Sequence, residues 1–408
     1  MPQVKPEVEA FARIKVFGIG GSGKNAVNHM INSRVKGVEF VAVNTDAQDL
    51  HHTQAKKKIH IGKNLTRGLG TGMNPELGKK AVEENKEEIQ EAVKGADMLF
   101  IAGGMGGGTG TGASPIIART AKELGVLTVA VVTKPFFFEG PQRTNYAEQG
   151  LEELKSSVDA IIIIPNDRLL STVDKETTAK NAFAMCDDIL KQAVEGISDL
   201  ITTPGIINTD FADIRAVMAD AGTALMGIGI ASGEKRSEEA AQSAINSPLL
   251  ELSINGARGV LFSISGGDDL TMHEIQDAAK IITESVDKDA KIIFGTVKDD
   301  KLKKGEVKIT VIASAFSEEA LKAGAIHKMG AVNGSRGDTE EEDVSISTGG
   351  SEKKSIHNTL APDGTKKKSS STDTSSKDDN GSNKTEIEED DDDDWGAVPA
   401  FLRRSKLK

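Results

Sequence analysis

The chain has 408 residues, is 38% hydrophobic and carries a formal net charge of −12 at pH 7, which suits two or three domains with a sizeable core. This acidic balance, with no basic cluster interleaved with aromatic residues, argues against nucleic acid as the main partner. The single cysteine, Cys186, excludes an internal disulfide framework and a cysteine metal site.

The N-terminal segment, residues 1–10, has no apolar leader, and nowhere do eighteen apolar residues run together. We therefore expect a flexible N-terminus, no direct membrane insertion and a cytoplasmic location.

A short strand at residues 13–17 leads through the glycine-rich residues 18–25 into a helix. Glycines 18, 20 and 23 match the dinucleotide-binding fingerprint, and Asp46 lies near the spacing of its ribose-binding acid. The same loop matches the P-loop spacing, but Asn25 stands where that motif needs Ser or Thr to hold magnesium. The P-loop interpretation fails at that residue, whereas a nicotinamide-dependent oxidoreductase remains an alternative.

The next strand, residues 39–43, ends in the polar segment 44–48. These side chains suit ribose or a bound ion, and simple capping of the strand end is an equal alternative. A third glycine loop, residues 68–73, precedes Asn74, a good N-cap, and Pro75, which suits the first helical position. This loop is placed to sense a terminal phosphate through its backbone.

Residues 103–112 contain seven glycines and are the most informative stretch of the chain. An apolar strand at 96–102 and a helix pattern at 113–124 bracket them, so we expect a strand-to-helix loop outside the core. Uncovered backbone N–H groups and a helix N-terminus make an anion cradle, most simply for phosphate. A mobile linker is the alternative, which the tight bracketing disfavours. Several glycine loops at strand ends favour one nucleotide lying across the edge of a parallel sheet.

Two further strands, at residues 126–133 and 160–164, flank a helix pattern at 147–154 and complete the signature of a doubly wound parallel sheet. Glu139 and Arg143 lie on the loop between these strands, at the same carboxyl edge. They are candidates for nucleotide contacts, with a solvated ion pair as the alternative.

Apolar residues recur every three and four positions from 178 to 202 and predict one long helix, with Cys186 packed on its apolar face. The Asp187 carboxylate can accept hydrogen bonds from a ring N–H and an exocyclic amine, the edge that guanine offers and adenine does not. Beyond this helix, Asp210 and Asp213 share one face if Asp210 caps a helix. Two such carboxylates polarise a water or hold a cation, or serve only as a cap and surface charge.

The second half has strands at residues 259–264, 291–295 and 307–312, with helix patterns at 237–244 and 272–285. This pattern predicts a smaller α+β unit with no obvious catalytic or binding motif of its own. Residues 317–394 have the composition of a disordered linker. Residues 395–408 follow an acidic run and combine apolar with basic residues, as a docking motif does; a frayed terminus is the alternative.

Together these motifs resemble the FtsZ family of tubulin-like bacterial division GTPases. Residues 106–112 resemble the tubulin signature of that family and residues 208–213 its synergy loop. Further matches, in the family's order, are residues 20–27, 44–46, 134–140 and 399–403.

The resemblance implies an α/β fold: a tubulin-like GTPase domain with a Rossmann-type parallel sheet (11–177), a long central helix (178–203) and a smaller α+β C-terminal domain (204–316). It implies GTP/GDP and Mg²⁺ as ligands, a homopolymer, a division site at midcell, and a tail at 395–408 that docks membrane-tethering and regulatory proteins.

It also assigns site residues. Asp210 and Asp213 would be catalytic, and would act on the nucleotide of the next subunit, so that the complete site forms only at a head-to-tail contact. The nucleotide-binding residues would be Gly20, Gly21, Ser22, Gly23, Lys24, Asn25, Gly104, Gly107, Gly108, Thr109, Gly110, Glu139, Arg143, Asn166, Phe183 and Asp187, of which the last three would frame the guanine.

Ser22, Lys24, Thr71 and Met73 depart from the usual residues of this family. None removes a backbone donor, so we expect altered rates with function retained. A nucleotide-binding filament protein without turnover remains a further alternative if Asp210 and Asp213 are only caps.

Overall fold

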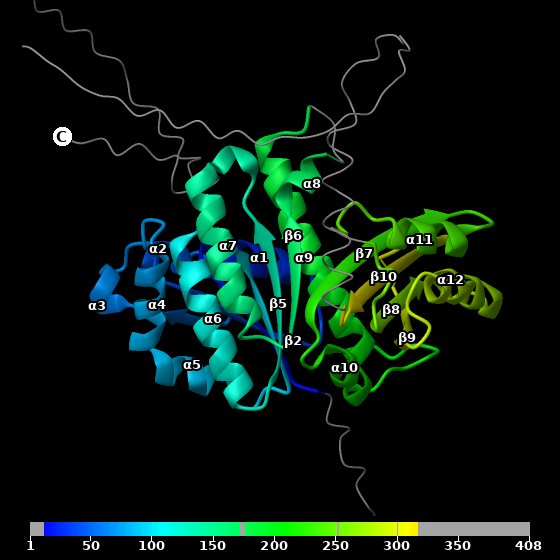
Figure 1. The fold of residues 1–408 in the computed structure, drawn as a ribbon, viewed down its shortest axis with the longest axis horizontal. Helices are drawn as coiled ribbons and strands as arrows, with labels where there is room; N and C mark the ends of the chain where they lie inside the picture. Colours follow the sequence, from blue (N-terminus) through cyan, green and yellow to red (C-terminus); the bar gives the residue numbers. More distant parts are fainter. Residues whose placement is uncertain (1–11, 172–175, 251–252, 300, 317–408) are drawn as a thin grey trace, which may run out of the picture. The chain divides into compact units, whose positions relative to one another are not determined.

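The fold is built on one sheet, whose strand order in the described part of the chain is β3-β2-β1-β4-β5-β6-β7-β10-β8-β9 (Figure 1). The computed structural model describes residues 12–171, 176–250, 253–299 and 301–316. The strands are β1 (Ile14–Ile19), β2 (Val38–Asn44), β3 (Lys57–His60), β4 (Met98–Gly104), β5 (Leu127–Lys134), β6 (Ala160–Pro165), β7 (Gly222–Ser232), β8 (Gly259–Gly266), β9 (Lys291–Lys298) and β10 (Glu306–Ser314).

The first six strands are parallel and confirm the predicted doubly wound sheet. Strand β1 pairs with β2 on one side and with β4 on the other, so the order 3-2-1-4-5-6 reverses at β1 and β4. In β5 every residue except the last is buried, which is typical of a parallel strand covered on both faces. The crevice at the carboxyl ends of β1 and β4 is where such sheets bind their ligands.

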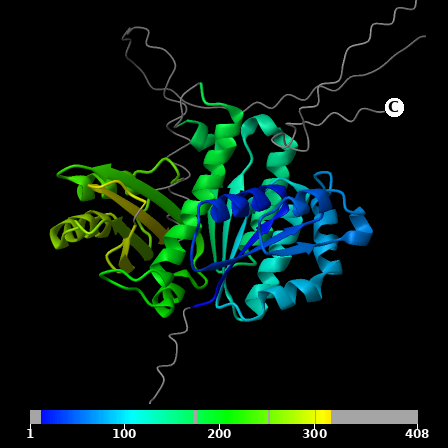
Figure 2. The ribbon, with the colours of Figure 1, turned by 180° about the vertical axis from the view of Figure 1, so that it is seen from behind.

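Helices cover both faces of the parallel part (Figures 1 and 2). One buried cluster joins the sheet to α1, α9 and α10, and a second joins the opposite face to α4, α5, α6 and α7. The helices are α1 (Gly20–Asn32), α2 (Ala47–His51), α3 (Lys63–Thr66), α4 (Pro75–Glu84), α5 (Lys86–Val93), α6 (Gly108–Glu123), the 3-10 turn η1 (Phe137–Glu139), α7 (Pro141–Lys155), α8 (Asn166–Leu170), α9 (Ala179–Thr202), α10 (Phe211–Met218), α11 (Arg236–Ile245) and α12 (Met272–Glu284).

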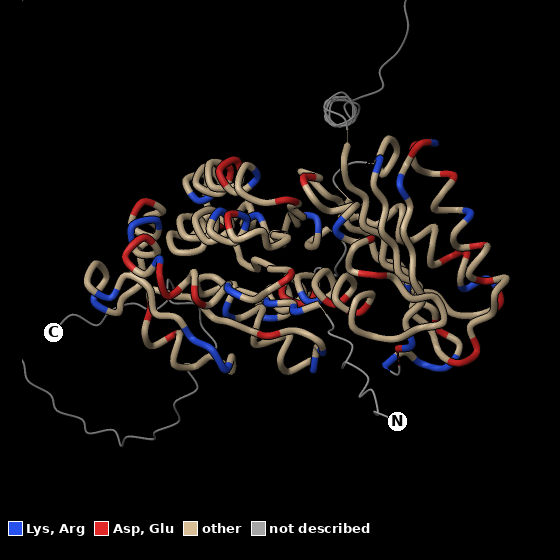
Figure 3. The backbone as a smooth tube through the Cα atoms, turned by 90° about the horizontal axis from the view of Figure 1, so that it is seen from below, with Lys and Arg blue, Asp and Glu red and all other residues tan. Residues whose placement is uncertain are grey.

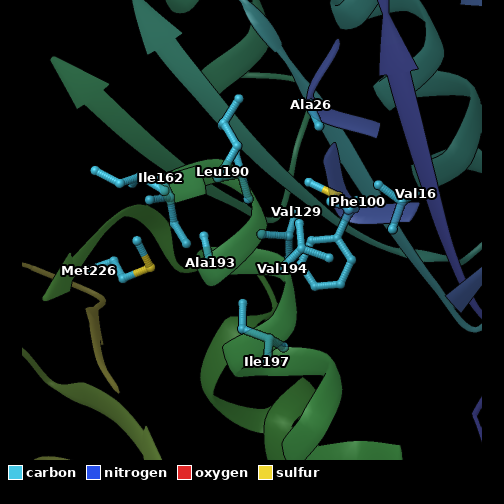
Figure 4. Close-up of a cluster of buried hydrophobic side chains, with 14 of the residues drawn as sticks. Val16, Ala26, Phe100, Val129, Ile162, Leu190, Ala193, Val194, Ile197 and Met226 are labelled. Carbon is cyan, nitrogen blue, oxygen red and sulfur yellow. The ribbon is translucent and has the colours of Figure 1, made fainter. Parts of the chain in front are cut away.

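The long helix predicted over residues 178–202 is α9, which begins after Thr178 and ends at Thr202. The Thr178 side chain caps it by accepting from the Asn181 N–H at 3.3 Å. Figure 4 shows Leu190 and Val194 of α9 packed among side chains of the parallel strands, with Met226 of β7 in the same cluster. This cluster also contains residues of β8, β9 and β10, so α9 forms the core that the two halves of the protein share.

The second half continues the sheet with mixed strand directions. Strand β10 is antiparallel to both β7 and β8, while β9 is parallel to β8. Helices α11 and α12 pack on this part around a third cluster of buried residues. Strand β7 was not predicted from the sequence. All the described residues belong to one compact unit.

The prediction that residues 103–112 form a loop outside the core is wrong. Strand β4 continues to Gly104 and α6 already begins at Gly108, which leaves only residues 105–107 between them. Eight of these ten residues are buried; Gly104 and Gly107 are half-buried. The glycines are packed against other backbone, as described below, and tertiary contact therefore overrides their low helix propensity.

The N-terminus (1–10), the linker (317–394) and the tail (395–408) expected from the sequence lie outside the described residues. Within the described ranges no helix is both long and apolar enough to cross a membrane. Acidic and basic residues are interspersed along the helices and loops of both halves (Figure 3).

Candidate functional site

The first glycine loop joins β1 to α1 with almost no intervening chain. Strand β1 ends at Ile19 and α1 begins at Gly20, which has a positive φ of 72°. A Cβ atom on Gly23 would collide with the carbonyl oxygen of Ala102 in β4, so this glycine allows α1 to pack against the sheet. Gly21 is exposed, and no side chain caps α1. The N–H groups of its first turn therefore face the carboxyl edge as an anion site.

The second glycine segment brings the N-terminus of α6 next to that of α1. A Cβ atom on Gly20 would lie 3.1 Å from the amide nitrogen of Gly110, and one on Gly104 would lie 2.8 Å from Oγ of Ser22. Helix α6 starts after Gly107, and no side chain caps it. Two uncapped helix N-termini thus lie side by side at the point where the strand order reverses, and their positive dipole ends converge there.

Three threonine hydroxyls tie the third glycine loop to α6. Oγ1 of Thr109 lies 2.8 Å from Oγ1 of Thr45 and 3.4 Å from Oγ1 of Thr71. Asn74 caps α4, as predicted, and its Oδ1 accepts a backbone N–H of the first turn at 3.2 Å. A Cβ atom on the exposed Gly72 would meet nothing within 4 Å. This loop therefore presents open backbone beside the N-terminus of α6.

Lys24 is held in an ion pair beside the first loop. Its Nζ lies 2.7 Å from Oδ1 of Asp49, and Nδ2 of Asn44 donates to the other oxygen of that carboxylate at 2.8 Å. A P-loop lysine must reach the phosphates, so this pairing gives a second reason against that motif. Asp46 accepts two backbone N–H groups at the start of α2 and therefore caps this helix.

Glu139 and Arg143 form a pair that is largely shielded from solvent. Their side chains are 9% and 23% exposed, and Nη1 of Arg143 lies 2.7 Å from Oε2 of Glu139. The other oxygen of Glu139 accepts the Phe136 N–H at 2.9 Å. A Cβ atom on Gly106 would lie 2.7 Å from the carbonyl oxygen of Arg143, so α7 begins directly against the second glycine segment. The alternative of a solvated pair is wrong.

The three residues expected to frame a base lie beyond this pair. The Phe183 ring meets Phe136 edge to face, with centroids 5.3 Å apart, and Asp187 lies one turn further along α9. Asn166, at the start of α8, is buried, and its Oδ1 has no hydrogen-bond partner in the described part of the chain. A buried acceptor without a donor is costly, and a ligand N–H is a natural partner. Burial raises the pKa of Asp187 to about 7, against the lowering effect of His29 and Lys24.

Asp210 and Asp213 are not part of this group. Both are exposed at the N-terminus of α10, where they form a capping box: Oδ1 of Asp210 accepts the Ala212 N–H at 3.0 Å and Oδ2 of Asp213 accepts the Asp210 N–H at 3.3 Å. Helix α10 lies at the opposite edge of the sheet, since Nη2 of Arg215 donates to Gly125, just before β5. Strand β5 has 8 residues and spans about 26 Å between these edges. In Figure 1, α8 is drawn above the sheet and α10 below it.

No group of three His, Cys, Asp or Glu side chains in the described ranges is arranged to hold a metal ion. The carboxylates nearest the helix N-termini already have partners, as Asp49 and Asp46 show.

Sequence reasoning missed two participants in this region, Asp49 and His29. Asp49 neutralises Lys24, and His29 places Nε2 3.1 Å from Oδ1 of Asp188. The only sequence signal for Asp49 was the unusual Lys24 itself, because a lysine in a packed loop needs a counter-charge. His29 had no such signal.

Two family models match the chain. One, described as the GTPase domain of the Tubulin/FtsZ family, matches residues 13–174, and the other, the C-terminal domain of the FtsZ family, matches residues 222–317. An empty FtsZ dimer from M. jannaschii shares 44% sequence identity, covers 75% of this chain and 89% of that chain, and has a TM-score of 0.72.

Two proteins from Haloferax volcanii share the fold at lower identity. A GTPγS-bound protofilament of CetZ2 is 19% identical, with a TM-score of 0.64 over 79% of this chain and 98% of that chain. A GDP-bound monomer of CetZ1 is 22% identical, with a TM-score of 0.65 over 78% and 99%.

Proposed function

The chain belongs to the FtsZ family of tubulin-like, GTP-hydrolysing cytoskeletal proteins, and from this premise we propose that it polymerises head to tail and completes its GTPase site at the contact between subunits. Asp210 and Asp213 of one subunit would act on the GTP held by the next. Membership of this family sets aside the nicotinamide-dependent alternative.

The observation that supports this proposal most strongly is the separation of the two halves of the site. The glycine loops lie at the carboxyl edge of the parallel strands, and Asp210 and Asp213 lie at the amino edge. A subunit cannot bring its own carboxylates across the sheet, whereas a head-to-tail neighbour presents its amino edge to this carboxyl edge. Such a heterologous contact repeats and gives a filament. The dimer and the protofilament among the related structures are consistent with self-association.

In this proposal the phosphates bind at the N-termini of α1 and α6, through backbone N–H groups of residues 20–25, 104 and 107–110. The Glu139–Arg143 pair contacts the nucleotide beside them. Asn166, Phe183 and Asp187 frame the guanine; the unpartnered Oδ1 of Asn166 accepts from the base, and the Phe183 ring packs against it.

Hydrolysis needs an oriented water on the far side of the γ-phosphate. Asp210 and Asp213 are exposed, and their capping bonds fix the carboxylates in position before any contact forms. From a neighbouring subunit they would orient or polarise this water, while the helix N-termini stabilise charge on the phosphates. Mg²⁺ bound with GTP would supply positive charge that neutralises the phosphates. The described residues offer no ligand cluster for it, so its ligands would be mainly phosphate oxygens and water.

The remaining parts of the proposal concern location and partners. The resemblance of residues 399–403 to the family's tail motif supports docking of membrane-tethering and regulatory division proteins through residues 395–408. We place the protein in the cytoplasm, at the division site at midcell, with no nucleic acid partner.

The test is phosphate release measured over a range of protein concentrations. Turnover per subunit should rise with concentration, because the site is shared, and Asp213→Ala should bind GTP normally while turnover falls about a hundredfold or more. Asp213→Asn is the matched variant: its side-chain oxygen still caps α10 but its charge is lost. Turnover that is independent of concentration, or unchanged in both variants, would refute the shared site and leave the two residues as caps.

A mixing experiment isolates the intermolecular step. Asp213→Ala keeps intact nucleotide loops, and Gly107→Arg blocks the α6 N-terminus but keeps Asp213. Neither variant should hydrolyse GTP alone. In a 1:1 mixture, roughly a quarter of the subunit contacts join an intact nucleotide site to an intact Asp213, and activity should reappear at these contacts. A mixture as inactive as its components contradicts catalysis across the interface.

A further inference from the structure

The connection between α9 and α10 carries the Asp210 carboxylate. Helix α9 ends at Thr202 and α10 begins at Phe211, and residues 203–210, all of which the structure describes, form neither helix nor strand. The capping box fixes Asp210 and Asp213 relative to α10, but it does not fix where the start of α10 lies. The contacts that hold this connection therefore decide where the two carboxylates stand.

The connection is hydrogen-bonded to two residues of β9. In the described sheet β9 is the last strand, so one row of its backbone groups faces away from β8. The Thr296 N–H donates to the carbonyl oxygen of Ile207 at 3.0 Å, and the Ile207 N–H donates back to Oγ1 of Thr296 at 2.9 Å. Oγ1 of Thr209 donates to the carbonyl oxygen of Phe294 at 3.3 Å. The chain thus runs along the outer edge of β9 up to Thr209, and Asp210 is the next residue.

Close packing supports these hydrogen bonds. A Cβ atom on Gly205 would collide with the carbonyl oxygen of Thr296, and one on Gly295 would lie 2.9 Å from Oγ1 of Thr209 and 3.2 Å from the carbonyl oxygen of Ile207. Thr296 is only 3% exposed, so water competes poorly for its hydroxyl. Residues 205–209 therefore have little freedom to move away from β9.

We propose that Thr296 and Thr209 are positioning residues, which set the place of Asp210 and Asp213 for the nucleotide of the next subunit. The inference rests on the proposed function, in which these carboxylates act across the contact between subunits. A group that orients a water must be placed accurately, since an error of about 1 Å can lower a rate by roughly a hundredfold. The two threonines act through the connection and do not touch the nucleotide.

The experiment removes one hydroxyl at nearly constant shape. In Thr296→Val the Ile207 N–H loses its acceptor. At saturating GTP and equal amounts of sedimented filament, turnover should fall about tenfold, while GTP affinity below the assembly concentration stays unchanged. Thr296→Ser keeps the hydroxyl and should keep the turnover of the parent. Thr209→Val should lower turnover in the same way as Thr296→Val.

Thr310→Val is the matched control. Thr310 is also buried in the second half, but it lies on β10, which β8 separates from β9. This variant should keep the turnover of the parent.

Mixing assigns the defect to one side of the contact, which a general loss of structure would not do. Gly107→Arg offers intact carboxylates to the intact nucleotide sites of Thr296→Val. A 1:1 mixture of the two should turn over about threefold faster per subunit than Thr296→Val alone. Asp213→Ala offers no such carboxylates, so its 1:1 mixture with Thr296→Val should fall to about half the rate of Thr296→Val.

The outcomes separate this inference from the function on which it rests. The inference is overturned if Thr296→Val filaments turn over like those of the parent. It is also overturned if Gly107→Arg gives no gain with Thr296→Val although it recovers activity with Asp213→Ala, and in both cases the proposed function stands. If Gly107→Arg with Asp213→Ala stays inactive, the proposed function itself fails. Should Thr296→Val not assemble, Thr209→Val carries the same tests.

Discussion

Gly112 and Gly107 lie five residues apart in the same glycine-rich stretch, and we predict that alanine at each has opposite consequences. A Cβ atom on Gly112 would collide with the carbonyl oxygen of Pro75 and lie 2.8 Å from the amide nitrogen of Lys79. These atoms belong to the backbone of α4, which cannot rotate away, so α4 must shift. Overpacking of this kind destabilises the fold by up to about 3 kcal/mol, and the higher helix propensity of alanine offsets about 1 kcal/mol of this loss.

Gly112→Ala should therefore lower the free energy of unfolding by about 2 kcal/mol, and the melting temperature by several degrees. A Cβ atom on Gly107 would meet nothing within 4 Å, and its φ of −82° suits any residue. Gly107→Ala should leave the stability of the nucleotide-free protein within about 0.5 kcal/mol of the parent. Its methyl group stands at the N-terminus of α6, where the proposed function places the phosphates, so GTP affinity should fall about tenfold.

The assay is urea unfolding of both variants with and without GTP. At a GTP concentration of one hundred times Kd the parent gains about 2.7 kcal/mol, and a tenfold loss of affinity removes about 1.3 kcal/mol of this gain. Gly112→Ala should lose stability in both conditions, and Gly107→Ala only with GTP. If Gly112→Ala is as stable as the parent, the glycines are not needed for packing of α4 on α6. If Gly107→Ala keeps full affinity, its open Cβ position does not face the ligand.

Two predictions concern the second half and the central helix. Burial raises the pKa of Asp199 to about 6, above its unfolded value of about 3.9, so its carboxylate destabilises the fold above pH 6 and has no such effect below pH 4. Asp199→Asn should therefore gain about 2 kcal/mol at pH 7.5 and nothing at pH 3.5 in urea unfolding; an equal gain at both pH values contradicts this cause. The buried Arg236 pairs with Asp269 at 2.7 Å and lowers the pKa of Glu274 to about 2. Because Glu274 titrates near 4.3 when unfolded, this stabilisation is present above that pH and disappears as the pH falls towards 2. Arg236→Met should cost about 2 kcal/mol at pH 7, with the difference from the parent shrinking between pH 5 and pH 2; a constant difference contradicts it.

Most of the parallel half of the sheet was predictable because its strands are short apolar runs, and two of them, β1 and β4, end in glycine-rich segments. Strand β7 lacks that signal, since Gly222, Gly227 and Gly229 dilute its apolar residues. The structure explains two of these glycines: a Cβ atom on Gly227 or Gly229 would collide with a carbonyl oxygen of α11. Because α11 packs closely against β7, these positions require glycine. The same glycines weaken the apolar pattern by which the strand would be recognised in the sequence. Strand β3, Lys57–His60, was not predicted for another reason. It is a short polar strand at the edge of the sheet, and Ile59 is its only fully buried residue.

The sequence predicted the separate motifs of the candidate site but not the side-chain contacts between them. Motif spacing identified the three glycine loops and, through the resemblance, Asn166 and Asp187. The ion pair between Lys24 and Asp49 joins residues from different elements, and no local pattern encodes such a contact. Likewise, the glycines of residues 103–112 were interpreted as an open loop, because packing against α4 is a tertiary feature that a local pattern does not contain.

The charge pairing within one subunit explains why assembly and hydrolysis would be coupled. Three carboxylates beside the glycine loops are already engaged: Asp46 caps α2, Asp49 holds Lys24, and Glu139 holds Arg143. In the proposed mechanism these three would not be available to orient a water at the γ-phosphate, and the group that hydrolysis needs would come from a neighbour. The capping box of α10 fixes two exposed carboxylates in advance on the opposite edge, and a neighbour that supplies them brings little further ordering cost. In the proposed mechanism GTP would then be stable before assembly and hydrolysed only after it.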